Sequence, residues 1–238
     1  MLSAKVPVVL VTGFEPFGGD TVNPSWEIAR RLEGWEPGPV PAIVQAVLLP
    51  CVFRDALEVL NEAITRRRPV AVIGLGLAAS RRDISVERVA INVDDARIPD
   101  NAGLQPIDQP VCPGAPAAYW STLPIKSIVA ALQEAGIAAS VSQTAGTFVC
   151  NHVFFGLAHR LAGRNRRAGS ADGSGGGRIR PMVRGGFIHV PWPAAGQDSL
   201  PAADGPLDLE TMVEALRIAI RVTLTVKADR LLPGGAIE

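Results

Sequence analysis

The stretch VPVVLVT at residues 6–12 decides the fold, because a run of β-branched apolar residues predicts a strand that is buried on both faces. Four later apolar runs alternate with segments of helical periodicity, and they occupy residues 43–49, 70–75, 140–144 and 186–190. Buried strands that alternate with helices are typical of a mainly parallel sheet with helices on both faces. The sequence therefore predicts an α/β fold, specifically a three-layer α/β/α sandwich around a twisted, mostly parallel sheet.

Apolar residues that recur every three or four positions predict three helices, at residues 54–68, 124–135 and 209–227. A fourth helix should begin at Asn23-Pro24, a cap followed by proline, and continue to Leu32. Residues 163–180 are Gly, Ser, Ala and Arg with almost no large apolar side chain, so we expect a flexible insertion there. The whole chain, 1–238, should form one domain.

Composition limits the classes of partner. The 238 residues are 47% hydrophobic, enough for one sizeable core. Lys plus Arg and Asp plus Glu both total 23, so no net charge attracts nucleic acid or an anionic membrane. The apolar run 6–11 is too short to span a bilayer and lacks the features of a signal peptide, which favours a cytoplasmic protein. Three cysteines favour free thiols, and no cluster of ligands indicates a metal.

A candidate nucleophile lies in the stretch TAGTFVCNH at residues 144–152. The pattern predicts that a strand ends, a short turn follows and a helix begins, so that Cys150 lies at or near the helix N-terminus. The helix dipole and free N–H groups at that end favour thiolate over thiol. A small buried hydrophobe is the equally balanced alternative for Cys150. Cys51 and Cys112 have no comparable setting, and we interpret them as pocket-lining or structural residues.

A reactive thiol needs an imidazole to accept its proton, and the chain has three histidines. His152 and His159 are predicted to lie inside the helix that Cys150 opens, where neither swings back easily to the sulfur. His189 lies near the end of a predicted strand, just before Pro191, and sites in α/β sheets assemble at the carboxyl ends of strands. Elimination therefore favours His189 as the base.

Glu87 is the candidate third group, because it interrupts an alternation of apolar residues and a buried carboxylate needs a partner. An imidazolium would serve, and the carboxylate would then orient the ring. A salt bridge with Arg88 or Arg81 is the alternative, and the residues alone favour it.

Two glycine-rich stretches imitate nucleotide-binding motifs. GLGLAA at residues 74–79 imitates a dinucleotide fingerprint, but residues 84–91 alternate as a strand does, whereas the fingerprint requires a helix. GFEPFGG at residues 13–19 has no GK[ST] and contains two phenylalanines, so it suits an apolar ring better than a phosphate. We therefore predict no cofactor.

Three groups of segments together resemble the pyroglutamyl-peptidase I family of cysteine peptidases, also called pyrrolidone-carboxylate peptidases. They are residues 12–19 with 23–26, residues 87–92 with 95–101, and residues 145–152 with 185–191. The likeness covers nearly the whole chain. It implies a thiol exopeptidase that hydrolyses the bond after an N-terminal pyroglutamate, with pyroglutamyl peptides as substrates.

The family's catalytic residues fall on Cys150, His189 and Glu87 of this sequence. The resemblance also implies a substrate-binding set, namely Phe14, Phe17, Asn23, Leu77, Arg97, Ile98, Phe148 and Val149. The lactam is a small uncharged ring, which an apolar pocket suits. Neither a metal nor a cofactor is implied, and a homo-oligomer, either a dimer or a tetramer, is compatible with the sequence.

The chain departs from the family at residues 76–81, where Gly-Leu-Ala-Ala-Ser-Arg replaces the common Gly-Gln-Ala-Gly-Gly-Arg. Leu77 removes an amide, and side chains fill two glycine positions, which restricts the backbone. Two alternative functions follow. One is a protein of the same fold that binds pyroglutamate with weak or no catalysis, and the other is a purine-nucleoside-phosphorylase-like transferase, which would need a phosphate site that is not apparent.

Overall fold

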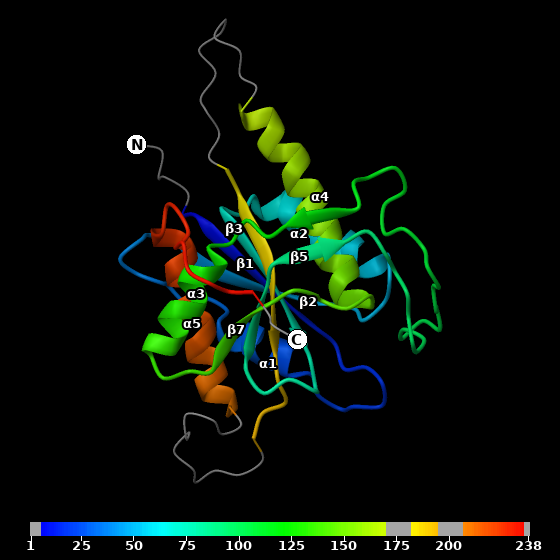
Figure 1. Ribbon diagram of the computed structural model, residues 1–238, viewed down its shortest axis with the longest axis horizontal. Helices are drawn as coiled ribbons and strands as arrows, with labels where there is room; N and C mark the ends of the chain where they lie inside the picture. The colour runs from blue at the N-terminus through cyan, green and yellow to red at the C-terminus, as the bar shows by residue number, and fades with distance from the viewer. Residues whose placement is uncertain (1–5, 170–181, 195–206, 236–238) are drawn as a thin grey trace, which may run out of the picture.

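The centre of the computed structural model, which describes residues 6–169, 182–194 and 207–235, is a six-stranded sheet with strand order β2-β1-β3-β8-β4-β7 (Figure 1). Its strands are β1 (Val8–Phe14), β2 (Ile43–Leu49), β3 (Ala71–Leu77), β4 (Ile84–Glu87), β7 (Ala139–Ser142) and β8 (Arg184–Val190). All neighbouring strands in this sheet run parallel except β4 and β8, which are antiparallel. The predicted α/β fold with a mostly parallel sheet is confirmed.

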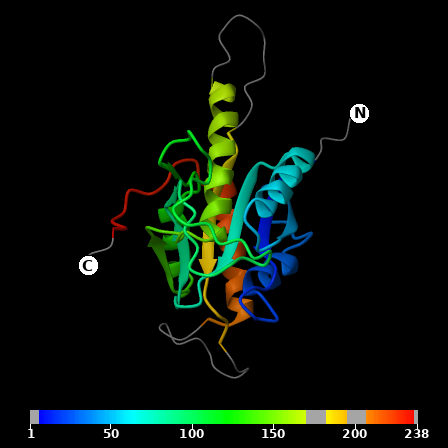
Figure 2. The ribbon, with the colours of Figure 1, turned by 90° about the vertical axis from the view of Figure 1, so that its right-hand side faces the viewer.

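Helices cover both faces of the sheet and complete the three layers (Figure 1). They are α1 (Pro24–Arg31), α2 (Asp55–Arg67), α3 (Ile125–Glu134), α4 (Val149–Gly169) and α5 (Leu209–Thr225). On one face α5 contacts both α1 and α3, whereas α2 and α4 pack together on the opposite face. Figure 2 shows α4 extending alongside β8, with which it is in contact. All four predicted helices are present, with ends that differ by at most two residues.

Alternation along the central strands builds two hydrophobic cores, one on each face of the sheet. Val9 and Val11 of β1 pack with α1, α3 and α5, whereas Leu10 and Phe14 pack with α2 and α4. Because successive side chains of a strand point to opposite faces, a strand that is apolar at almost every position becomes buried on both sides. This is the physical basis of the pattern in residues 6–12.

The predicted extended segment at residues 84–91 is divided between two sheets. Its first half is β4, and its second half, β5 (Val89–Ile91), pairs with β6 (Ala118–Trp120) in a separate antiparallel sheet. The side chain of Asn151 in α4 fixes β5, because it accepts a hydrogen bond from the Ile91 N–H at 3.0 Å and donates one to the Ile91 carbonyl at 2.9 Å. The start of α4 is thereby held against β5.

The prediction of a flexible loop at residues 163–180 is wrong for its first part, because α4 continues through Gly169. Arg and Ala are good helix formers. In addition, the Asn165 side chain bonds both the N–H and the carbonyl of Val183, each at 3.2 Å, which ties this part of the helix to the chain just before β8. Residues 170–181 lie outside the described residues. Among those that are described, no helix is long and apolar enough to cross a membrane.

Candidate active site

Cys150 is the second residue of α4, so the predicted position at a helix N-terminus is confirmed. The turn before the helix is held in place by several hydrogen bonds. Gly146 has a φ of 76°, which favours glycine, and its N–H donates to the Thr144 hydroxyl at 3.0 Å. The Thr147 hydroxyl donates to the Asp95 carbonyl at 2.7 Å, and the Thr147 backbone carbonyl accepts from the Asp95 N–H at 2.9 Å. The thiol therefore projects from a well-defined backbone.

The Cys150 thiol lies directly over Gly76 of β3. A Cβ atom added at Gly76 would be 2.7 Å from Sγ, well inside ordinary contact distance. Gly76 is the register partner of His189 on β8. Because register partners on adjacent strands project to the same face of a sheet, the thiol and the imidazole lie on the same face, above neighbouring strands.

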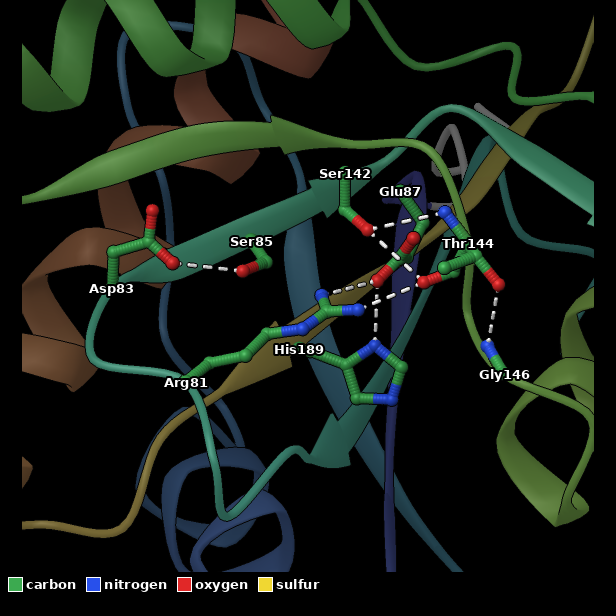
Figure 3. Close-up of polar contacts among 8 residues, drawn as sticks. All are labelled: Arg81, Asp83, Ser85, Glu87, Ser142, Thr144, Gly146 and His189. Carbon is green, nitrogen blue, oxygen red and sulfur yellow. Dashed lines mark hydrogen bonds and ion pairs between the residues drawn. The ribbon is translucent and has the colours of Figure 1, made fainter. Parts of the chain in front are cut away.

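The His189 imidazole is held by the carboxylate of Glu87, which is the last residue of β4 (Figure 3). His189 Nδ1 lies 2.7 Å from Glu87 Oε1, and both residues are buried. Since Nδ1 is bonded to the carboxylate, the ring carries its proton there and presents Nε2 as the free acceptor. Glu87 Oε2 has no hydrogen-bond partner within the described part of the chain.

Arg81 is a fourth member of this network (Figure 3). Its Nη1 donates to Glu87 Oε1 at 2.6 Å, and its Nη2 donates to the Thr144 carbonyl at 2.8 Å. The guanidinium thus links the buried carboxylate to the turn that leads to Cys150. The two sequence interpretations of Glu87 are both realised, since the carboxylate binds His189 and Arg81, whereas Arg88 donates to the Gly234 carbonyl.

Electrostatics favour a neutral resting pair. Burial raises the pKa of the Cys150 thiol far above its usual range, and the nearby Cys51 and Glu87 raise it further, against the lowering effect of Arg81. Burial also lowers the pKa of His189, and the Glu87 carboxylate opposes that shift only in part. The helix N-terminus favours the thiolate of Cys150, whereas burial favours the neutral thiol.

Aromatic side chains surround this network. The rings of Phe17 and Phe148 lie 6.1 Å apart, and Phe148 immediately precedes α4. On the sheet side, Phe187 contacts Phe14 at 6.4 Å and the His189 ring at 5.0 Å. Four phenylalanines thus place two apolar surfaces close to the residues that carry the thiol and the imidazole.

Asn23, which the resemblance places in the binding set, is buried and bonded within the protein. Its Oδ1 accepts from the Ser25 N–H at 3.1 Å and the Ser25 hydroxyl at 2.8 Å, and its Nδ2 donates to the Glu15 carbonyl at 3.0 Å. This side chain caps α1 and braces the loop that presents Phe17.

The other residues of the binding set are distributed between strand, helix and loop. Leu77 ends β3 and is half-buried, whereas Val149 is buried at the first position of α4. Arg97 and Ile98 lie on an exposed loop. The turn after Leu77 is closed by a hydrogen bond from the Arg81 N–H to the Ala78 carbonyl at 2.9 Å.

The concern raised by the two filled glycine positions in that turn is removed. Ala79 and Ser80 do not adopt a positive φ, since the non-glycine residues that do so are Arg54, Arg68 and Asp108. Side chains at these two positions therefore introduce no left-handed strain.

Sequence reasoning did not recognise Gly76 or Phe53 as parts of the site, whereas it interpreted Cys51 as pocket-lining or structural. The signal for Gly76 was present in the GLG stretch, since a glycine on a central strand indicates close approach of another group. Phe53 packs edge-on against Phe148 at 5.3 Å. Cys51 is buried with its N–H bonded to Glu15 at 3.0 Å, and burial, followed by the charges of Glu15 and Asp100, raises its pKa to about 12.

A separate cavity of about 520 Å³ lies beyond Phe53 and contains none of the three catalytic candidates. His152 lines it with both ring nitrogens bonded, Nδ1 to Asp94 at 2.7 Å and Nε2 to the Arg54 N–H at 3.1 Å. His152 is therefore committed to structure, as elimination predicted. Within the described residues, no group of three or more His, Cys, Asp or Glu side chains is placed to hold a metal ion.

A thiol on the same face of the sheet as an imidazole that a buried carboxylate orients, on an α/β/α sandwich, is typical of cysteine-dependent acyl-transfer enzymes. The family model described as pyroglutamyl peptidase matches residues 7–226 of this chain. The pyrrolidone-carboxylate peptidase of Klebsiella pneumoniae (strain 342) is 54% identical over 228 residues, which cover 96% of this chain and 98% of that protein. The corresponding peptidase of Escherichia fergusonii is 50% identical with the same coverage.

Comparison with solved structures points to the same family. The pyroglutamyl peptidase I from Bacillus amyloliquefaciens superposes with a TM-score of 0.81 at 43% identity, covering 96% of this chain and all of that one. The pyrrolidone carboxyl peptidase from Thermococcus litoralis gives a TM-score of 0.79 at 36% identity, covering 95% and 99%. The chain belongs to the pyroglutamyl peptidase family, which confirms the resemblance found in the sequence.

Proposed function

We propose that Cys150 is the nucleophile, His189 the general base and Glu87 the orienting carboxylate of this pyroglutamyl peptidase. One observation carries the proposal. Sγ lies over Gly76, the register partner of His189, whose Nδ1 is held 2.7 Å from the Glu87 carboxylate. The thiol is thereby placed on the same face as an imidazole whose Nε2 is available.

The reaction begins with a neutral thiol, because burial keeps the pKa of Cys150 high and that of His189 low. Nε2 of His189 accepts the thiol proton as Sγ attacks the carbonyl that joins pyroglutamate to the next residue. Glu87 stabilises the imidazolium that forms, and Arg81 donates a hydrogen bond to this buried carboxylate at 2.6 Å.

Backbone N–H groups of the first turn of α4 have no intrahelical partner, so they supply donors for the developing oxyanion. His189 then returns its proton to the leaving amine, and the C–N bond breaks to leave a thioester on Cys150. Water, activated by the same imidazole, hydrolyses the thioester and releases free pyroglutamate. Protons balance over the cycle without a cofactor.

The lactam ring is proposed to bind between the apolar side chains before α4 and those at the end of β1. The Phe17 and Phe148 rings lie tilted against each other with centroids 6.1 Å apart, and Val149 continues this apolar surface next to Cys150. Such walls bind a small uncharged ring by burial of apolar area. Leu77, at the end of β3, is proposed as an apolar wall in place of the amide common in the family. Arg97 and Ile98 are proposed to approach the substrate from their exposed loop.

We further propose a cytoplasmic location, because the mechanism needs Cys150 as a free thiol and a reducing compartment maintains it. The entire chain is proposed to act as one peptidase domain. No observation on this chain favours the binding-protein alternative, and the choice between a dimer and a tetramer stays a prediction.

Turnover of a chromogenic pyroglutamyl amide tests the proposal, with iodoacetamide as inhibitor and peptide mapping to identify the alkylated cysteine. Activity should fall in step with modification of Cys150. Cys150→Ser should fold with an unchanged melting temperature and lose nearly all turnover, whereas Cys112→Ser, the matched control, should keep it. Activity that persists after complete alkylation of Cys150 would refute its role.

A further inference from the structure

We propose that Cys112, His159 and Tyr119 form a second thiol site, separate from the peptidase centre, that forms mixed disulfides with low-molecular-weight disulfides. Cys112 Sγ lies 3.9 Å from His159 Nε2, and the Tyr119 hydroxyl lies 2.9 Å from His159 Nδ1. The arrangement combines a nucleophile, a base and a group that orients the base.

Each member of this trio is held by a different part of the fold. His159 lies on α4, nine residues after Cys150, which is about 13 Å along the axis at 1.5 Å per residue. Tyr119 is the central residue of β6 and pairs with Ala90 of β5. Its ring packs against Phe155 at 5.2 Å, and Phe155 in turn stacks on the His159 ring at 6.3 Å. The imidazole is therefore fixed on two sides.

Cys112 lies in the irregular segment between β5 and β6, yet its backbone is clamped. The Asn92 side chain accepts from the Cys112 N–H at 2.9 Å and donates to the Cys112 carbonyl at 3.0 Å. The same amide reaches the Ala115 carbonyl at 3.4 Å. These hydrogen bonds fix the backbone of this segment and so hold the Cys112 sulfur beside the imidazole.

The site is open to small molecules. Cys112, Tyr119 and His159 are all half-buried, and the neighbouring Pro113 and Gly114 are exposed. A thiol that is partly accessible and in contact with an imidazole differs from Cys51, which is buried without a histidine contact in the described residues. Partial exposure beside a base is the setting in which cysteines react with external disulfides.

The reaction is thiol–disulfide exchange. With its proton on Nδ1 and directed to Tyr119, His159 presents Nε2 to the Cys112 thiol and takes its proton. The thiolate attacks one sulfur of the reagent, a new S–S bond forms at Cys112 and the reagent's own S–S bond breaks. The released half leaves as a thiolate and receives the proton from His159 Nε2, so electrons and protons balance.

The test uses oxidised glutathione and mass-spectrometric peptide mapping of the full chain carrying Cys150→Ser, so that Cys51 and Cys112 are the thiols that remain. Cys112 should form the mixed disulfide faster than Cys51, and faster than Cys112 itself does in denaturant. An ordinary free thiol is only about 3% thiolate at pH 7, so imidazole assistance should raise the rate about tenfold. Equal rates for folded and denatured Cys112 would overturn the proposal.

Two variants in the same background separate assistance by the base from simple exposure. His159→Gln should lower the folded rate of Cys112 about tenfold, and Tyr119→Phe should lower it by a smaller factor, since it removes only the orienting bond. Circular dichroism checks folding. If His159→Gln does not fold, Tyr119→Phe decides instead, because loss of the bond that orients His159 should also lower the folded rate of Cys112. A rate in Tyr119→Phe equal to that of the parent would then refute the proposal.

Discussion

Gly76 offers a direct test of where the catalytic thiol lies. Gly76→Ala would place a Cβ atom 2.7 Å from Cys150 Sγ and 2.8 Å from the Phe187 ring. Ordinary contact begins at 3.4 Å, so the sulfur must move by about 0.7 Å. Displacements near 1 Å at a reacting atom cost about 10²-fold in rate. We therefore expect kcat/KM for a chromogenic pyroglutamyl amide to fall about 10²-fold.

Gly74→Ala is the matched control on the same strand. Its Cβ atom would meet the Phe187 ring at 2.5 Å, but no atom of Cys150 is among its nearest neighbours. Both variants overpack the same core, at a cost of about 1–3 kcal/mol in the free energy of unfolding. The melting temperatures should therefore fall by similar amounts.

Activity per folded molecule separates the two variants. Gly74→Ala should lose less than about tenfold in kcat/KM, because strain on Phe187 reaches the thiol only indirectly. Iodoacetamide labelling of Cys150 supplies a second measure, since a displaced sulfur loses its imidazole partner. The reasoning is refuted if Gly76→Ala keeps the parent kcat/KM, or if Gly74→Ala loses as much activity.

Three further predictions test the network around this thiol. Glu87→Gln removes the charge that stabilises the His189 imidazolium and should lower kcat about 10²- to 10⁴-fold. Glu62→Gln, at an exposed position, is the control and should leave kcat unchanged. An undiminished kcat in Glu87→Gln would contradict the orienting role of this carboxylate. Because burial lowers the pKa of His189, its neutral form persists below pH 6.5, so the acid limb of the kcat/KM profile should lie below that pH. The contribution of His189 to the free energy of unfolding should be present above pH 6.5 and lost as the pH falls through the lowered pKa. An acid limb above pH 6.5 would contradict the prediction. Leu77→Gln should lower KM about two- to tenfold if the glutamine amide common in the family binds the lactam, whereas the control Leu77→Met should not. A KM for Leu77→Gln equal to that of the parent would mean that the backbone of the turn, and not the side chain, binds the lactam.

The fold was predictable because its signal is local and repeated. Each buried strand appears as an apolar run, and each helix appears as a periodic stripe with a recognisable start. Asn23 illustrates this, since the cap predicted from Asn23-Pro24 is formed by a side-chain bond to the Ser25 N–H. The loop prediction at 163–180 was wrong in its first part because composition does not register a long-range bond such as that between Asn165 and Val183.

The site was only partly predictable, because its geometry depends on which strands become neighbours. Elimination indicated His189, but nothing local to β8 shows that β4 is adjacent and antiparallel to it. That pairing brings Glu87 against the imidazole across 102 positions of sequence. The role of Arg81 was equally hidden, since the sequence presented histidine and arginine as alternative partners of the carboxylate and the structure uses both.

The high pKa of Cys150 follows from the same packing that makes the site. The sequence places the thiol at a helix N-terminus, where the dipole favours the thiolate. The glycines of β3 allow α4 to approach the sheet so closely that the sulfur lies over Gly76, and the loss of solvent there favours the neutral thiol. Cys150 and Cys112 are both half-buried, so the surroundings of each sulfur distinguish the two thiols: His189 held by Glu87 for Cys150, and His159 bonded to Tyr119 for Cys112.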